Sequence, residues 1–367
     1  MFDENMLKEL ASIQTRGPIL SVYLDVDPIQ QASEAYKLKL REMLKQVEGT
    51  ADSADVDAVR HYIDYAYDWS GRSLVLFSRQ DEDFWHAFPL AVPVRSSVVV
   101  ADKPYISPLI ALIGLYGHYA VALVDRQGGR FFLFEMGELV IEETATGELV
   151  RHTRKGRGSS VVGMRGGAGF SGRKEAEVVQ RNIKDTANAF GEFCDKHHPR
   201  QVLLAGSDRT LAQFQDLITS RLGSLVAGTF SSDMDATETQ IREQSFAMIQ
   251  EIGANRHKEL VNTVRTSAAK GMNGVVGLDE TLTIAHEGRV QVLITARDYH
   301  APGFRCKGCG YLTAQQLEKC LFCGGQFEVI PDAVEAVVAQ VIEKGGSAEI
   351  IDDDQMDQMQ IGALLRY

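Results

Sequence analysis

The chain has 367 residues, a formal net charge of −12, 44% hydrophobic residues and 24% charged residues. This composition is that of a folded globular protein, and the length exceeds what one hydrophobic core usually serves, so we expect two or three domains. No stretch approaches the roughly 20 consecutive apolar residues of a membrane-spanning helix. The opening residues, MFDENMLKEL, lack the apolar segment of a secretory signal, so we expect a cytoplasmic protein without a membrane partner.

The first part of the chain, residues 1–116, combines expected strands with expected helices. Four runs alternate apolar and polar residues or are continuously apolar, which is typical of strands, and two stretches show helical periodicity. The strands are expected within PILSVYLDVDP, RSLVLFS, DFWHAFPL and SSVVVAD, and the helices at residues 33–48 and 54–67. We interpret this part as an N-terminal α/β domain.

The remaining chain repeats strand and helix patterns in two further parts, a middle domain at residues 117–236 and a C-terminal domain at residues 237–367. In the middle part, three strands are expected in HYAVALVDRQGGRFFLFEMGELVIEETAT, then a helix from about 173 to 197, a strand in QVLLAGSD, a helix at 208–221 and a strand in SLVAGTF. In the last part, we expect a helix at 237–269, mixed elements in GVVGLDETLTIAHEGRVQVLITA, a helix near 331–345, and strands in SAEIID and IGALLRY. Such repeats indicate layered α/β domains, and the fold class is therefore α/β with three domains.

Four of the five cysteines form two close pairs. Cys306 and Cys309, followed by Cys320 and Cys323, give the pattern C-x2-C twice, and a glycine follows each pair. Two such turns can direct four thiolates to one point, so the spacing predicts a zinc ribbon at residues 304–328. Because four thiolates leave no open coordination position, we expect the zinc to be structural rather than catalytic.

A glycine-rich, basic stretch, RKGRGSSVVGMRGGAGFSGRKEAE, precedes the long helix expected in the middle part. Gly167, Gly169 and Gly172 reproduce a G-x-G-x-x-G dinucleotide fingerprint, but no strand leads into the first glycine, as such a site requires. The stretch also resembles a P-loop, except that Arg173 and Lys174 stand where the loop lysine and the hydroxyl residue belong. Both nucleotide-binding interpretations are therefore weak.

The charge of this region differs from that of the rest of the chain. From Arg151 to Lys184 there are nine Lys or Arg residues and two acids, Glu175 and Glu177, in a protein whose net charge is −12. A locally basic segment on an acidic body favours contact with a polyanion such as RNA through this segment alone. A basic loop that is simply solvated is the alternative interpretation.

The second and third parts resemble the archaeal and eukaryotic class I peptide-chain release factors. The resemblance rests on the paired strands, the RKGRG…RGG loop, the long helix and LLAGS, and on KGMNGVVGLDETLTIAHEGRVQVLITA with a cysteine-bearing insert and the terminal IGALLRY. It covers residues 95–367 in good order and the first part more loosely. The ribosome-rescue protein Pelota and bacterial offshoots of the family, including the hibernation factor Balon, share the three-domain plan. The resemblance implies a translation-associated protein that occupies the ribosomal A site.

The loop that carries catalysis in the release factors is altered in this chain. In the family the loop ends in Gly-Gly-Gln and enters the peptidyl transferase centre, and here Gly166 and Gly167 match the glycines while Ala168 replaces the glutamine. Glycine still permits close approach to RNA, but an alanine side chain can neither orient a water nor donate a hydrogen bond. The resemblance implies that the loop reaches the centre without efficient hydrolysis, through Arg165, Gly166, Gly167, Ala168 and Gly169.

The stop-codon reading motif of the family is missing as well. The release factors read stop codons with an Asn-Ile-Lys-Ser loop between two helices of the first domain, and the corresponding turn here reads EGTADSADVD. This turn is acidic, so decoding of stop codons is expected to be absent.

The resemblance also implies partners. The basic side chains expected to contact rRNA, or a tRNA, are Arg154, Lys155, Arg157, Arg173, Lys174 and Arg181. By analogy, the C-terminal domain with its zinc ribbon is expected to contact a translational GTPase or the stalk region of the ribosome.

Three functions stay open at this point. Ribosome hibernation fits a loop that keeps both glycines without the glutamine, and stalled-ribosome rescue suits the same features; we favour hibernation. The alternative is a codon-independent peptidyl-tRNA hydrolase, in which the backbone amide of Ala168 or the side chain of Ser171 positions water. No catalytic side chain is predicted from the sequence.

Overall fold

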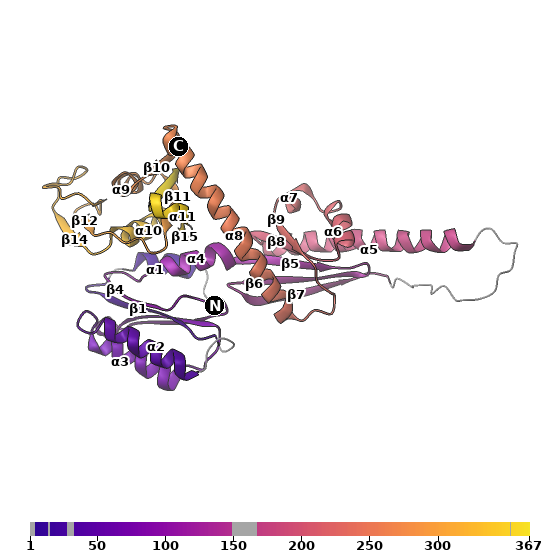
Figure 1. Cartoon of the computed structure of the whole chain (residues 1–367), viewed down its shortest axis with the longest axis horizontal. Coiled ribbons are helices and arrows are strands. Elements are labelled where there is room, and N and C mark those ends of the chain that lie inside the picture. Colours follow the sequence, from indigo (N-terminus) through magenta and orange to yellow (C-terminus); the bar gives the residue numbers. More distant parts are fainter. Residues whose placement is uncertain (1–3, 14, 28–32, 149–166, 353) are drawn as a thin grey trace. The chain divides into compact units, whose positions relative to one another are not determined.

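The computed structural model describes residues 4–13, 15–27, 33–148, 167–352 and 354–367. The chain forms two compact units, one made of Met1–Leu115 together with Gly253–Tyr367 and the other of Tyr116–Ile252. Each of the three successive parts of the chain contributes its own β-sheet, and a small ribbon sheet is added near the C-terminus (Figure 1).

The N-terminal part is built on a four-stranded antiparallel sheet with the order β3-β2-β1-β4. Its strands are β1 (Ile19–Asp25), β2 (Ser73–Arg79), β3 (Phe84–Leu90) and β4 (Ser97–Ala101). Its helices are α1 (Glu4–Ser12), α2 (Ser33–Gln46), α3 (Ser53–His61) and α4 (Ser107–Tyr116), with a π-helical turn (Tyr62–Ala66) after α3 and a 3-10 turn (Gln80–Glu82) after β2.

The core of this part follows from the alternation of side chains along the strands. Leu20, Val22 and Leu24 of β1 point to the same face because successive strand residues point to opposite faces. They pack with Leu40 of α2 and Val59 of α3 in one cluster of buried residues. Helices α2 and α3 therefore cover this face of the sheet (Figure 1).

The middle unit is a five-stranded mixed sheet with the order β7-β6-β5-β8-β9. Strands β5, β6 and β7 are antiparallel neighbours, whereas β5, β8 and β9 run parallel. Its elements are β5 (His118–Val124), β6 (Gly128–Glu135), β7 (Glu138–Thr146), α5 (Gly167–His197), β8 (Gln201–Gly206), α6 (Asp208–Gln215), α7 (Ser220–Gly223), β9 (Val226–Phe230) and α8 (Glu238–Ala269), of which α8 continues into the other unit.

Helix α5 is held on this sheet by the C-terminal part of its length. Ile183, Ala187 and Phe190 recur at three- and four-residue spacing, which places them on one face of the helix. They are buried with Phe131 and Leu204 of the sheet in one cluster. The helix extends past the end of the sheet toward its own N-terminus (Figure 1).

The C-terminal part is a four-stranded sheet with the order β10-β16-β11-β15, in which β11 and β15 are parallel and the other pairs antiparallel. The ribbon forms a separate antiparallel sheet with the order β13-β12-β14. The elements are β10 (Gly274–Val276), α9 (Leu278–His286), β11 (Val290–Ala296), β12 (Gly303–Cys306), β13 (Leu312–Thr313), β14 (Phe327–Ile330), α10 (Ala333–Glu343), β15 (Ser347–Ile351), α11 (Asp354–Met359) and β16 (Ile361–Leu365).

The α/β fold class and most expected elements are confirmed, with three differences. The expected helix at 208–221 is wrong as one element, because α6 ends at Gln215 and the N-cap Thr219 opens α7. Helix α4 was not anticipated, since its sequence SPLIALIGLY is apolar on every side and shows no periodicity. Helix α5 begins at Gly167 rather than near residue 173.

Among the described helices, none combines the length and the apolar character that crossing a membrane requires.

Candidate functional site

The N-terminus of α5 carries part of the loop that the sequence singled out. Gly167, Ala168 and Gly169 form the first turn of this 31-residue helix. The first amide N–H groups of an α-helix have no acceptor within the helix, and the helix dipole adds partial positive charge there. The backbone of these three residues is therefore suited to an anionic neighbour such as a phosphate.

Of the other expected loop residues, some lie within α5 and the rest lie outside the described residues. Arg173 and Lys174 lie within α5, and Arg181 lies further along the same helix. The guanidinium of Arg181 is 3.3 Å from the carboxylate of Glu148, and both side chains are largely exposed, so this ion pair contributes little to stability. The remaining expected residues lie outside the described residues: Arg154, Lys155, Arg157, Arg165 and Gly166.

Helices α2 and α3 of the N-terminal part are joined by a short turn at residues 47–52. Asp52 is the N-cap of α3, since its carboxylate accepts a hydrogen bond from the Ala54 amide at 2.9 Å. Glu48 lies 3.4 Å from Arg60 of α3. The two acidic side chains of this turn thus cap α3 and pair with it, and the turn has an acidic character.

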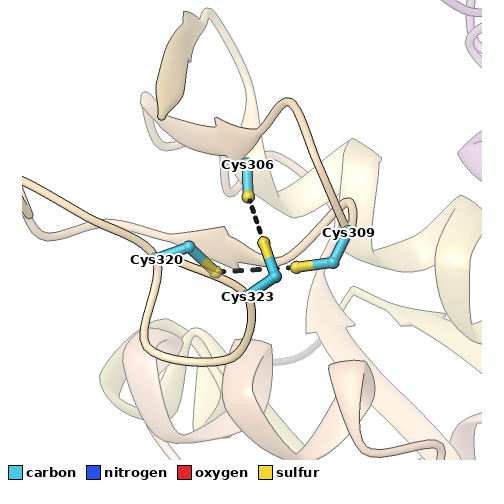
Figure 2. Close-up of side chains that lie close together, drawn as sticks. All are labelled: Cys306, Cys309, Cys320 and Cys323. Carbon is cyan, nitrogen blue, oxygen red and sulfur yellow. Dashed lines mark hydrogen bonds between the residues drawn. The ribbon is translucent and has the colours of Figure 1, made fainter. Parts of the chain in front are cut away.

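The four expected metal ligands come together in the ribbon. The sulfur atoms of Cys306, Cys309, Cys320 and Cys323 all lie within 4.8 Å of one another, and Figure 2 shows them converging from two turns. The Sγ–Sγ distances are 3.4 Å for Cys306–Cys323 and 3.5 Å for Cys309–Cys320. A tetrahedral zinc with Zn–S bonds of about 2.3 Å places its sulfurs roughly 3.8 Å apart, so the arrangement fits this ion.

The two turns that carry the cysteines have the same backbone geometry. The Gly310 amide donates to the Cys306 carbonyl, and the Gly324 amide donates to the Cys320 carbonyl, each at 2.9 Å. Gly310 has φ +74° and Gly324 has φ +72°, a left-handed conformation that glycine adopts without strain. The glycine after each cysteine pair therefore closes its turn.

The thiol groups of the cluster differ in acidity. Hydrogen bonds from the backbone amides of Cys309 and Gly308 lower the pKa of the Cys306 thiol to about 6. Burial raises the pKa of the neighbouring Cys309 thiol to about 12. A bound divalent cation favours the thiolate form of every ligand, and these differences would then disappear.

The ribbon is tied to the C-terminal sheet through α9. The carboxylate of Asp279 accepts hydrogen bonds from the Ala314 amide and the Gln315 side chain, both at 3.1 Å. The ring of Phe322, which lies between two of the cysteines, packs against His286 of α9 with ring centres 4.5 Å apart. Leu321 beside it leaves 75% of its surface exposed.

Sequence reasoning missed two buried polar groups that join distant segments. Asn182 of α5 contacts the backbone at both Arg126 and Glu148. Glu335 of α10 accepts hydrogen bonds from the Ile106 amide at 2.8 Å and from the hydroxyl of Ser107, the first residue of α4. A polar residue within a mostly apolar helix face was the available signal for Asn182.

The carboxyl group of Glu335 is enclosed by protein, although the residue as a whole is only partly buried. This enclosure raises the pKa of the carboxyl group to about 7, against the smaller lowering effect of the hydrogen bond from Ser107. Asp332 caps α10 nearby and accepts a hydrogen bond from His300 at 2.6 Å, which raises the pKa of that imidazole.

Comparison with known proteins shows what the middle of the chain is similar to. Residues 104–250 match the sequence model of one family, and this segment holds the five-stranded sheet and α5. The segment is similar to a release-factor family, as the sequence led us to expect. The family is described as bacterial archaeo-eukaryotic release factor family 10.

Similar proteins span nearly the whole chain at low identity. The uncharacterised protein Rv2629 of Mycobacterium tuberculosis (strain ATCC 25618 / H37Rv) is 24% identical over 371 residues, which cover 97% of this chain and 95% of that protein. The structure of Saccharomyces cerevisiae Dom34 is 9% identical, with 100% of this chain and 93% of that one covered and a TM-score of 0.41. Pelota of Archaeoglobus fulgidus is 12% identical, with coverages of 99% and 92% and a TM-score of 0.33.

Proposed function

We propose that this chain is a ribosome-binding translation factor that occupies the A site and blocks the peptidyl transferase centre of an idle ribosome. The observation that carries the proposal is the release-factor family match over residues 104–250, a segment in which Ala168 stands in place of the catalytic glutamine. The three parts at 1–116, 117–236 and 237–367 would then act as domains facing the decoding centre, the peptidyl transferase centre and a partner, respectively.

The middle domain would supply the contact with RNA. Its segment from Arg151 to Lys184 carries nine cations and two acids, and phosphate contacts of this kind dominate the affinity of proteins for nucleic acid. The amide groups at the start of α5, around Ala168, add donors that need no side chain. Together these features support a loop, with Arg165–Gly169 at its tip, that enters an environment dense in phosphate.

The replacement of glutamine decides between occupying the centre and hydrolysing its substrate. Ester hydrolysis requires a group that orients the attacking water, and a methyl side chain offers neither donor nor acceptor. The two preceding glycines are kept, so the loop can still approach RNA closely. We therefore infer that the loop shields the centre, as a hibernation factor would.

The N-terminal part supports a role that does not depend on a codon. The turn at residues 47–52 is short, and Asp52 and Glu48 are engaged by the helices it joins. Acidic side chains in this turn disfavour contact with the phosphates of mRNA. The resemblance to release factors thus stops at the segment that reads stop codons in that family.

The C-terminal part would hold a structural zinc and a protein partner. Cys306, Cys309, Cys320 and Cys323 would be the ligands, and a zinc bound by four thiolates supplies stability rather than chemistry. The exposed Leu321, next to these ligands, offers an apolar contact for a partner such as a translational GTPase.

The central experiment uses 70S complexes that carry peptidyl-tRNA, together with vacant 70S ribosomes. We expect the protein to co-sediment with vacant ribosomes, to protect nucleotides of the peptidyl transferase centre from chemical modification, and to release no peptide. The Ala168→Gln variant should gain peptide release, because it restores the missing side chain at the same position. Peptide release by the unchanged protein that disappears in the Gly166→Ala, Gly167→Ala double variant would support the hydrolase alternative instead. Failure to co-sediment with ribosomes at physiological salt would remove the proposal altogether.

The zinc assignment has its own test. Elemental analysis of purified protein should find one zinc per chain, and the Cys309→Ser variant should lose it. A strong chelator should lower the thermal stability of the C-terminal part, because metal binding contributes to its folding. Zinc-free protein of full stability would contradict the assignment.

A further inference from the structure

Asn182 is a buried polar residue on the apolar face of α5. It leaves 2% of its surface exposed and directly precedes Ile183, which lies in the core of the middle unit. A polar side chain at such a position costs free energy unless its hydrogen bonds are satisfied. Its partners therefore show what the residue is for.

Every donor of the Asn182 amide is used on the backbone of distant segments. Its oxygen accepts a hydrogen bond from the Glu148 amide at 2.9 Å, and its nitrogen donates to the Glu148 carbonyl at 2.8 Å. The second donor reaches the Arg126 carbonyl at 3.0 Å. One side chain thus joins α5 to the turn between β5 and β6 and to the residues that follow β7.

The three segments are fitted closely around this amide. The Gly147 amide donates to the Gln127 carbonyl at 2.7 Å, so the end of β7 is also bonded directly to the turn. A Cβ atom added at Gly147 would lie 2.4 Å from the Asn182 oxygen, which no real contact permits. The carboxylate of Asp125 accepts from the Gln127 and Gly128 amides, which fixes the turn itself. We call this arrangement the Asn182 clasp: Asp125–Gly128, Gly147, Glu148 and Asn182.

The position of the clasp gives it a role beyond packing. Glu148 is the last described residue before the basic segment Arg151–Lys184, and α5 carries the C-terminal part of that segment. From Gly167 to Asn182 the helix rises about 22 Å at roughly 1.5 Å per residue. The clasp therefore holds the place where the chain leaves the sheet, at Glu148, next to helix α5. The first turn of that helix contains Ala168.

We propose that Asn182 is a positioning residue that sets where the basic segment is presented to ribosomal RNA. This inference rests on the function proposed above. A leucine at this position would satisfy the apolar face equally well, but it could not bond the two backbone segments. Fully satisfied buried polar groups of this kind specify one arrangement of the chain.

The test compares Asn182→Ala with a matched control in the same helix, Ala187→Gly. Ala187 is buried on the same face of α5 and belongs to the core cluster, so glycine there weakens the helix without touching the clasp. In the free protein, hydrogen exchange at the Glu148 amide should accelerate in Asn182→Ala and not in Ala187→Gly.

Ribosome binding is then measured over a range of salt concentrations. If Asn182→Ala frees the backbone of one residue at the clasp, binding to the ribosome must order that residue again. This entropy cost corresponds to roughly a tenfold loss of affinity, and we expect at least this for the variant. The dependence of affinity on salt should also become shallower, because fewer cations reach phosphate together. Ala187→Gly should keep the salt dependence and the protection of the peptidyl transferase centre.

A conservative variant adds a readout that a purely structural role would not change. Asn182→Asp keeps the shape and one acceptor, but the ionised carboxylate has no donor for the two carbonyls. Protonation returns one donor, so ribosome binding by this variant should recover toward mildly acidic pH relative to binding by the unchanged protein at the same pH.

The outcomes separate this inference from the proposed function. Unchanged salt dependence and unchanged protection in Asn182→Ala would overturn the positioning role, even if the melting temperature fell. If the unchanged protein fails to bind ribosomes, the proposed function falls. The exchange measurement still decides whether Asn182 fixes the departure point, and equal exchange at Glu148 in both variants would refute that.

Discussion

Two buried polar side chains, one in each compact unit, bond a helix to backbone that is distant in the sequence, and they do so with different chemical groups. Asn182 joins α5 to two backbone segments through a neutral amide. Glu335 joins α10 to the start of α4 through a carboxyl group, which accepts from Ile106 and Ser107. Both fix segments far apart in the sequence, but only the carboxyl group can change its charge. The hydrogen bonds of Glu335 are therefore sensitive to pH, whereas those of the neutral Asn182 amide are not.

The largest expected effect concerns the pH dependence of stability. The folded-state pKa of Glu335 is raised from 4.5 to about 7, so the unfolded state loses its proton at lower pH than the folded state does. The contribution of Glu335 to the free energy of unfolding should therefore be largest below pH 4.5 and should fall as the pH rises toward 7, by about 3 kcal/mol. His300 acts in the same direction, because its pKa is raised by the hydrogen bond to Asp332.

Denaturant unfolding of Glu335→Gln across this pH range checks the assignment. The amide oxygen can still accept from Ile106, its NH2 can donate to the Ser107 hydroxyl, and the group cannot titrate, so the part of the pH dependence that comes from Glu335 should be lost while that of His300 and other groups remains. Glu343→Gln is the control, since Glu343 lies on the same helix and pairs with Lys103 at the surface. A pH dependence that is unchanged in Glu335→Gln would show that other groups govern this junction.

A smaller effect is expected at the clasp. Asn182→Ala should lower the free energy of unfolding of the middle unit by roughly 1–2 kcal/mol, because it removes three hydrogen bonds whose partners can turn to water. The loss should be the same at acidic and neutral pH when followed by thermal unfolding. A loss that varies strongly with pH would remove the contrast with Glu335.

The smallest effect is expected from removing the Ser107 hydroxyl group that donates to Glu335. Ser107→Ala removes one of the two donors to Glu335 and should cost about 1 kcal/mol. Because this hydrogen bond lowers the pKa of the Glu335 carboxyl group, its loss should move the midpoint of the pH dependence upward. An NMR titration of the carboxyl carbon would detect the shift, and an unmoved midpoint would contradict the role of the hydroxyl group.

The sequence predicted those features whose parts lie close together along the chain. Cys306, Cys309, Cys320 and Cys323 fall within a single short segment, so their spacing alone indicated a common metal. The strands of the three sheets were equally accessible, since alternation is a local pattern. Glycines at 167, 169 and 172 hid the first turns of α5, because glycine is disfavoured inside helices.

The long-range polar junctions could not be predicted in the same way. Asn182 meets Glu148 and Arg126, which are 34 and 56 residues away, and Glu335 meets Ile106 at a separation of 229 residues. No periodicity connects such partners, and one asparagine in an amphipathic helix has many possible explanations. Their pairing became visible only when the sheets and helices were placed.

The close contact between Gly147 and Asn182 constrains how these two positions can change during evolution. Because any side chain at this position would collide with the Asn182 amide, the two residues are expected to change together during evolution. Lineages that replace this glycine should also carry a smaller residue at position 182, and with it a differently anchored segment. Covariation at these two positions would then sort related proteins by how they hold the loop, independently of what its tip contains.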